Sequence, residues 1–163
     1  MPRFLVRLVP FIPAVVWQSL VYLVSFRYGT WLNTLYVLAL LNDAFGAGLD
    51  PIMLKVWNLR LRKLAHGFVY LVSAVLLMRG LGAQPAGARW ARGWKAGAAA
   101  LGIVLAASSF DEILQLFAGD RTGSISDVVI DMVGAVAGVA LYRWWDARRE
   151  RRRAEIEKPL VRA

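Results

Sequence analysis

Carboxylates, an amide and an arginine are concentrated in a short polar stretch between two strongly apolar runs of this chain. These side chains are Asp111, Glu112, Gln115, Asp120, Arg121, Asp127 and Asp131. Carboxylates can transfer protons, and a guanidinium can hold a phosphate through paired hydrogen bonds. Ionisable groups at the end of a membrane segment are costly and usually face a bundle interior or a water-filled cavity. The stretch therefore predicts where a site lies, but not which substrate it takes.

The overall composition places the chain in a membrane. Its 163 residues are 58% hydrophobic, with a mean hydropathy of +0.50, which is too apolar for a soluble domain of this size. The sequence holds no cysteine, which excludes disulfides, thiolate catalysis and cysteine-ligated metals. The formal net charge of +9 comes from arginines beside apolar runs and in the C-terminal tail. That distribution favours contact with a membrane surface over nucleic acid.

Four apolar stretches are long enough to cross a bilayer, which takes about 20 mostly apolar residues. They are residues 8–26, 64–81, 94–114 and 125–145. The first follows two arginines as in a signal peptide, but it is long and lacks a small-residue cleavage site, which favours a retained anchor.

Residues 31–41 are also apolar but too short to span, so we expect an interfacial or re-entrant helix there. The predicted fold is therefore all-α, a polytopic membrane helix bundle of four transmembrane helices plus this short helix. A transmembrane domain over residues 1–146 would be followed by a basic cytoplasmic tail at residues 147–163.

The distribution of positive charge predicts the orientation of this bundle. Basic clusters precede the first span, separate the second from the third and follow the fourth, and four spans put all three on one side. Because loops rich in Lys and Arg stay in the cytoplasm, we expect both termini to be cytoplasmic. One cluster, Lys55, Arg60, Arg62 and Lys63, falls on the outer side. It is either a local exception or a set of cations kept there to contact an anionic headgroup.

Helical spacing places most polar residues of the spans on shared faces. The second span carries His66, Tyr70 and Ser73, the third Ser108, Asp111 and Gln115, and the fourth Asp127 and Asp131. Glu112 is one residue off the stripe of the third span. Gly134 and Gly138 continue the acidic face of the fourth span, and their spacing lets helices approach closely. We therefore expect the acidic face to pack against other helices rather than lipid.

Each of these features also has a purely structural interpretation. The carboxylates and Arg121 can form a structural ion network, and a single histidine at a helix end is often only hydrogen-bonded. Residues 119–124 have the composition of a turn, with Ser124 or Ser126 capping the fourth span. They do not form a nucleotide-binding loop, because no lysine follows the glycines. The arginine-rich tail is most simply a membrane anchor.

Three motifs resemble those of the VanZ-like family, small bacterial integral membrane proteins named after a teicoplanin-resistance protein. They are Arg62-Lys63-Leu64-Ala65-His66-Gly67-Phe68-Val69-Tyr70, Asp111-Glu112-Ile113-Leu114-Gln115 and Arg121-Thr122-Gly123-Ser124-Ile125-Ser126-Asp127, with Gly134 and Gly138 after them. The resemblance covers residues 62–138. It implies a bacterial inner-membrane protein with a role in the cell envelope and reduced sensitivity to teicoplanin, and it implies no mechanism or cofactor.

The chain departs from the family pattern at three positions. Gly67 stands where phenylalanine is common, Val69 where an acidic residue is frequent, and Asp131 where asparagine is usual. The last change adds a titratable group beside Asp127 and leaves open whether Asp131 binds or only packs. We expect Asp131 to be the most tolerant of the acids.

The first hypothesis for function is a binding protein. An outward-facing polar pocket would bind an anionic membrane lipid or a polyprenyl-phosphate-linked cell-wall precursor. Arg62, Lys63 and Arg121 would hold the phosphate and Gln115 and Tyr70 would orient it. Ser124 and Asp127 complete the predicted ligand-binding set.

The second hypothesis is an intramembrane hydrolase or transferase acting on a lipid phosphate or amide. His66 would be the general acid or base, with Asp111 or Glu112 as its partner. No metal site is assigned, although a variant of this hypothesis has His66, Glu112 and Asp127 bind a divalent ion. A channel or transporter is less favoured, because no repeat is visible and the polar groups stop at one face.

Overall fold

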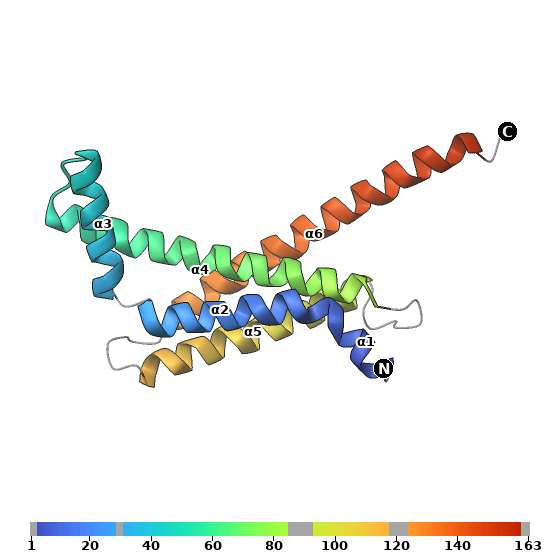
Figure 1. Cartoon of the computed structure of the whole chain (residues 1–163), viewed down its shortest axis with the longest axis horizontal. Coiled ribbons are helices and arrows are strands. Elements are labelled where there is room, and N and C mark those ends of the chain that lie inside the picture. Colours follow the sequence, from blue (N-terminus) through green and yellow to red (C-terminus); the bar gives the residue numbers. More distant parts are fainter. Residues whose placement is uncertain (1–2, 29–30, 85–92, 118–123, 161–163) are drawn as a thin grey trace.

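A computed structural model describes residues 3–28, 31–84, 93–117 and 124–160, and all regular secondary structure in these ranges is helical (Figure 1). The elements are α1 (Arg3–Leu8), the 3-10 turn η1 (Val9–Phe11), α2 (Ile12–Tyr28), α3 (Trp31–Phe45), α4 (Pro51–Gly82), α5 (Gly93–Phe117) and α6 (Ile125–Leu160). Figure 1 shows α2, α4, α5 and the first half of α6 running alongside one another, with α3 standing across them at one end.

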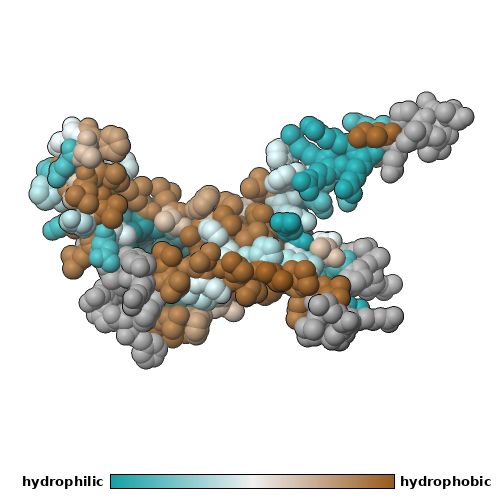
Figure 2. Space-filling model, viewed as in Figure 1, coloured by the Kyte–Doolittle hydropathy of each residue, from teal (hydrophilic) through white to brown (hydrophobic). Residues whose placement is uncertain are grey.

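Four segments are long and apolar enough to cross a membrane. They are Val6–Ser25, Pro51–Gly82, Gly93–Gln115 and Ile125–Ile156. Large apolar side chains cover the outside of these helices, and Figure 2 shows apolar colour along the bundle and polar colour on the second half of α6. The prediction of an all-α membrane helix bundle with four long apolar helices is therefore confirmed. The remaining apolar helix, Leu32–Phe45, is shorter than a span.

Two helices extend well beyond the predicted spans. Helix α4 begins at Pro51 because the Asp50 side chain accepts a hydrogen bond from the Met53 backbone N–H at 2.8 Å, and proline is favoured in a first turn. Helix α6 continues through the arginine-rich segment, where Arg148 and Arg149 lie over the rings of Trp144 and Trp145. Apolar patterning detects only the part of a helix that faces lipid. The predicted spans therefore miss the polar start of α4 and the polar end of α6.

The central pair of the bundle is α4 and α6, which share the most extensive interface. A Cβ atom added at Gly134 would collide with the carbonyl oxygen of Gly67, and one added at Gly138 would collide with the carbonyl oxygen of Leu71. The two backbones are therefore in direct contact, as the spacing of the two glycines predicts. Such contact replaces the hydrophobic effect, which does not drive helix association within lipid.

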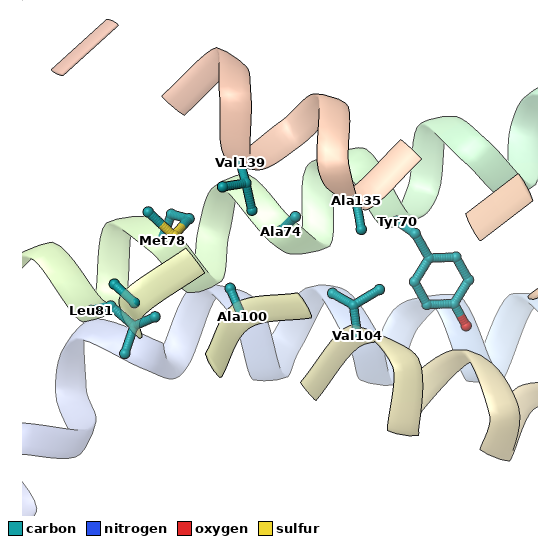
Figure 3. Close-up of a cluster of buried hydrophobic side chains, with 9 residues drawn as sticks. Tyr70, Ala74, Met78, Leu81, Ala100, Val104, Ala135 and Val139 are labelled. Carbon is teal, nitrogen blue, oxygen red and sulfur yellow. The ribbon is translucent and has the colours of Figure 1, made fainter. Parts of the chain in front are cut away.

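Small side chains continue this packing through the core. Figure 3 shows Ala74 and Met78 of α4, Ala100 and Val104 of α5, and Ala135 and Val139 of α6 facing one another, with Tyr70 at one end. Helix α2 is attached differently, through side-chain hydrogen bonds. Trp17 donates to the Val69 carbonyl at 3.3 Å, and the Tyr22 hydroxyl donates to the Ala107 carbonyl at 3.0 Å.

Candidate functional site

A buried aspartate joins three of the helices. Asp131 of α6 is fully buried, and its Oδ2 accepts a hydrogen bond from the Ser108 hydroxyl of α5 at 2.5 Å. Its Oδ1 lies 3.3 Å from Nδ1 of His66 on α4. This position argues against the expectation that Asp131 is the most tolerant acid, because its loss would leave two partners unpaired.

The carboxylates of α5 form a second group held by an amide. The Gln115 Nε2 lies 3.1 Å from Asp111 Oδ2 and 3.3 Å from Glu112 Oε1, and all three side chains are buried. The other Glu112 oxygen accepts a hydrogen bond from the Ser124 backbone N–H at 2.6 Å. Ser124 immediately precedes α6, so Glu112 ties the end of α5 to the start of α6, where the helix dipole favours negative charge.

His66, Asp111 and Glu112 meet at one point between α4 and α5. One potential ligand atom from each residue lies within 4.8 Å of the other two. Asp127 is engaged elsewhere, because it lies 3.4 Å from the Lys63 ammonium. Among the described residues, the structure therefore groups Asp111, rather than Asp127, with His66 and Glu112.

Two of the three cations predicted to hold phosphate together have separate partners. Arg62 donates to the Thr34 hydroxyl of α3 at 3.4 Å, whereas Lys63 faces Asp127 and Ser126 of α6. Ser126 in turn contacts the Ser124 hydroxyl at 2.7 Å. The structure thus brings Arg62 to the α3 side and Lys63 to the α6 side. Arg121 lies outside the described residues.

A cavity of about 330 Å³ reaches this polar cluster from the surface of the bundle. Its walls are mostly apolar and come from α2 and α4; among them are Trp17, Leu20, Val21, Val24, Ala65 and Val69. Its polar lining includes Thr34, Arg62, His66, Tyr70 and Asp111. Leu20 and Val24 are half exposed, so the cavity is bordered by side chains on the outer surface of α2.

Sequence reasoning missed the contribution of α2 and α3 to this cavity. Gln18 and Ser19, next to Trp17, interrupt an otherwise apolar run and line a neighbouring cavity, and that interruption was the available signal. Trp17 also donates to the Ser73 hydroxyl at 3.2 Å. Thr34 had no comparable signal, because its role depends on where α3 packs. Tyr70 and Gln115, both predicted site residues, lie in the cavity wall and the carboxylate group respectively.

The fold and the site together define a small polytopic helical membrane protein with a buried acid–histidine cluster. The chain belongs to the VanZ/LLP1 family, whose sequence model matches residues 7–146. This match confirms the resemblance and extends it from the motif region to all four spans. Comparison with curated proteins and with solved structures finds no match.

Proposed function

We propose that this protein binds an anionic lipid in the bacterial cell envelope, either a membrane phospholipid or a polyprenyl-phosphate-linked cell-wall precursor. The hydrocarbon chain would lie in the cavity between α2 and α4, and the phosphate would lie at its polar end. The observation that carries the proposal is the cavity itself, whose apolar walls lead to a cation and hydrogen-bonding groups.

The shape and lining of the cavity suit an amphiphile. Its volume of about 330 Å³ is within the range of small-ligand sites, which bind apolar groups and fix orientation through a few polar contacts. A site open to the bilayer also receives a lipid without moving its chain through water. Part of the chain would remain in the bilayer, beyond Leu20 and Val24 at the rim.

Arg62 is the residue best placed to select an anionic headgroup. It lines this cavity and also a second one of about 780 Å³ between α3 and α4, which is bordered by Asn33, Tyr36 and Asn58. A guanidinium binds phosphate through two parallel hydrogen bonds, so Arg62 can hold a headgroup at the junction of the two spaces. His66 and Tyr70 would then contact the headgroup from the α4 side.

Lipid retention tests the proposal. Native mass spectrometry of detergent-purified protein should detect a co-purifying phospholipid or polyprenyl phosphate. Arg62→Gln and Val24→Trp should each reduce the retained lipid at least about tenfold, because one removes the phosphate ligand and the other fills the cavity. Arg60→Gln and Val133→Trp are matched controls that should retain lipid, since neither residue lines the cavity. Equal retention in all four variants would contradict the proposal.

The outward direction of the site is a separate part of the proposal. Cysteines introduced as Arg60→Cys and Thr122→Cys should both react with an impermeant maleimide in intact cells. A Gly87→Cys variant should react only after the membrane is permeabilised, because the positive-inside rule puts that region in the cytoplasm. Labelling of Thr122→Cys only after permeabilisation would place the site on the inner face.

A role in teicoplanin sensitivity would follow from binding a lipid-linked precursor. Membership of the VanZ/LLP1 family supports this part of the proposal. Expression of the protein in a sensitive host should raise the inhibitory concentration of teicoplanin, and Arg62→Gln should abolish the increase. No change with the unaltered protein would remove the antibiotic role while leaving lipid binding open to its own test.

The contact between His66 and Asp131 favours hydrolysis of a lipid phosphate as a second candidate. A carboxylate at 3.3 Å from Nδ1 orients the imidazole, so its other nitrogen could take a proton from water. The water oxygen would bond to phosphorus, the bond from phosphorus to the lipid oxygen of a phosphate monoester would break, and the imidazolium would return the proton to that oxygen, so the products would be a lipid alcohol and phosphate. Release of phosphate from the retained lipid that stops in His66→Ala would support this function, and no release would exclude it for that lipid.

A further inference from the structure

We propose that His66, Asp111 and Glu112 bind one divalent transition-metal ion, of the kind represented by Zn²⁺ or Mn²⁺, between α4 and α5. The proposal goes beyond lipid binding and is testable without lipid. It starts from the distance between the three groups. Ligand atoms around an ion with bonds of about 2.1 Å are separated by roughly 3–4 Å. The three atoms in this structure lie within 4.8 Å of one another, so small side-chain rotations bring them into range.

The orientation of the imidazole matches that of a metal ligand. Nδ1 of His66 faces Asp131 Oδ1 at 3.3 Å, which is an ion-pair distance and not a formed hydrogen bond, and Nε2 would then be the nitrogen that binds the ion. Histidines that bind metals usually donate their other N–H to a carboxylate, which fixes the tautomer and the ring plane. Asp131 is itself fixed by the Ser108 hydroxyl at 2.5 Å. Asp131 would therefore be a positioning residue that acts through His66.

The two carboxylates are also held in place by hydrogen bonds to neighbouring groups. Gln115 Nε2 lies within hydrogen-bonding distance of one oxygen of Asp111 and one of Glu112, and the Ser124 N–H fixes the second oxygen of Glu112. Each carboxylate oxygen has further lone pairs that can bind a cation. Two acids at adjacent buried positions repel each other strongly in a medium of low dielectric constant, and a divalent cation between them offsets that repulsion.

A buried hydroxyl provides an independent indication of a ligand. Tyr70 is 1% exposed, and its hydroxyl has no hydrogen-bond partner among the described residues. It lies one helical turn from His66 and lines the same cavity as His66 and Asp111. Buried hydroxyls normally have a partner. A water bound to the metal would supply one.

The donor set indicates the kind of metal. One imidazole and two carboxylates are compatible with zinc or manganese, whereas magnesium and calcium prefer oxygen ligands alone. Three protein ligands leave coordination positions open towards the cavity. When lipid is bound as proposed above, an open position could accept a phosphate oxygen, and that consequence alone rests on the proposed function.

Metal titration of delipidated protein tests the site. The full chain, purified without a histidine tag and treated with EDTA, should bind one equivalent of Zn²⁺ in isothermal titration calorimetry. His66→Ala should abolish binding, and Glu112→Gln should weaken it at least about tenfold, because each removes a direct ligand. Asp146→Asn, which removes an exposed carboxylate of α6 outside this group, is the matched control, and its Zn²⁺ affinity should equal that of the unaltered protein.

Asp131 tests the positioning role. Asp131→Asn should weaken Zn²⁺ binding by about 10- to 100-fold, and Asp131→Glu should recover part of the loss. X-ray absorption of the zinc-loaded, unaltered protein should show one imidazole with oxygen ligands, a result that needs no variant. Binding of no Zn²⁺ or Mn²⁺, or equal affinity in His66→Ala, Glu112→Gln and the unaltered protein, would overturn the proposal. In that case a proton shared between Asp111 and Glu112, and not a metal ion, would reduce the repulsion between the two carboxylates.

Discussion

The two sides of α4 are packed in opposite ways. On one side α6 presses its backbone against α4, with Gly134 and Gly138 in positions where a methyl group would collide with carbonyl oxygens. On the other side α2 leaves cavities. Only 6% of the most apolar part of the first span, Val6–Ser25, is buried, against 33% of that of α4. The tight side fixes where His66 and Asp131 meet. The loose side gives a ligand a path to them, so rigidity and access are provided by different helices.

The largest expected effect comes from separating α4 and α6. Gly134→Ala should lower the free energy of unfolding by about 3 kcal/mol or more, because the new methyl group meets a backbone that cannot rotate away. Gly67→Ala, on the facing helix, should have little effect, since its Cβ would lie 3.5 Å from the nearest atom, on Ile130. Unfolding of both variants in detergent checks this. Similar losses in the two would show that the tight contact is not where the structure puts it.

The next effect in size comes from the buried aspartate in the tight region. Asp131→Ala should cost about 1–3 kcal/mol, because it leaves the Ser108 hydroxyl and His66 without their partner. Asp127→Ala should cost less than about 1 kcal/mol, since its ion pair with Lys63 is partly exposed to solvent. The same unfolding measurement distinguishes them. An equal loss of unfolding free energy in the two variants would mean that the deeper burial of Asp131 does not make it more important for stability than Asp127.

A smaller effect is expected where α2 attaches to α4. Trp17→Phe should reduce stability by about 1 kcal/mol, because the ring remains while its hydrogen bonds to Val69 and Ser73 are lost. Hydrogen exchange should increase in α2 and stay unchanged in α6 if the two sides of α4 are independent. Faster exchange across both helices would contradict that independence.

The smallest effect is expected between α2 and α5. Tyr22→Phe removes the hydroxyl that donates to the Ala107 carbonyl at 3.0 Å, but keeps the edge-to-face contact with Phe110 at 5.7 Å between ring centres. We expect a loss of about 0.5 kcal/mol in stability. Combined with Trp17→Phe, the losses should add, because the two side chains bond to different helices. A loss of stability in the double variant that is clearly larger than the sum of the two single losses would show that α2 detaches cooperatively.

The sequence by itself determined the fold class and most members of the site. Long apolar runs must form helices in lipid, since no water satisfies their backbone groups, and polar residues at helical spacing must share a face. His66, Asp111 and Gln115 were predicted on that basis, with Glu112 one residue off the stripe, and the structure places all four together. The close approach at Gly134 and Gly138 was also predictable, because only glycine permits it.

The tertiary structure alone decided which partners these residues take. Asp127 and Asp131 lie on the same face of α6 one turn apart, yet Lys63 lies beside the first and His66 beside the second. Periodicity assigns a face but not the neighbour across it, because the neighbour depends on the axial offset of two helices. That offset is set by backbone contact between Gly67 and Gly134. The same reason applies to Trp17 and Thr34, whose place at the cavity depends on the packing of α2 and α3 against α4.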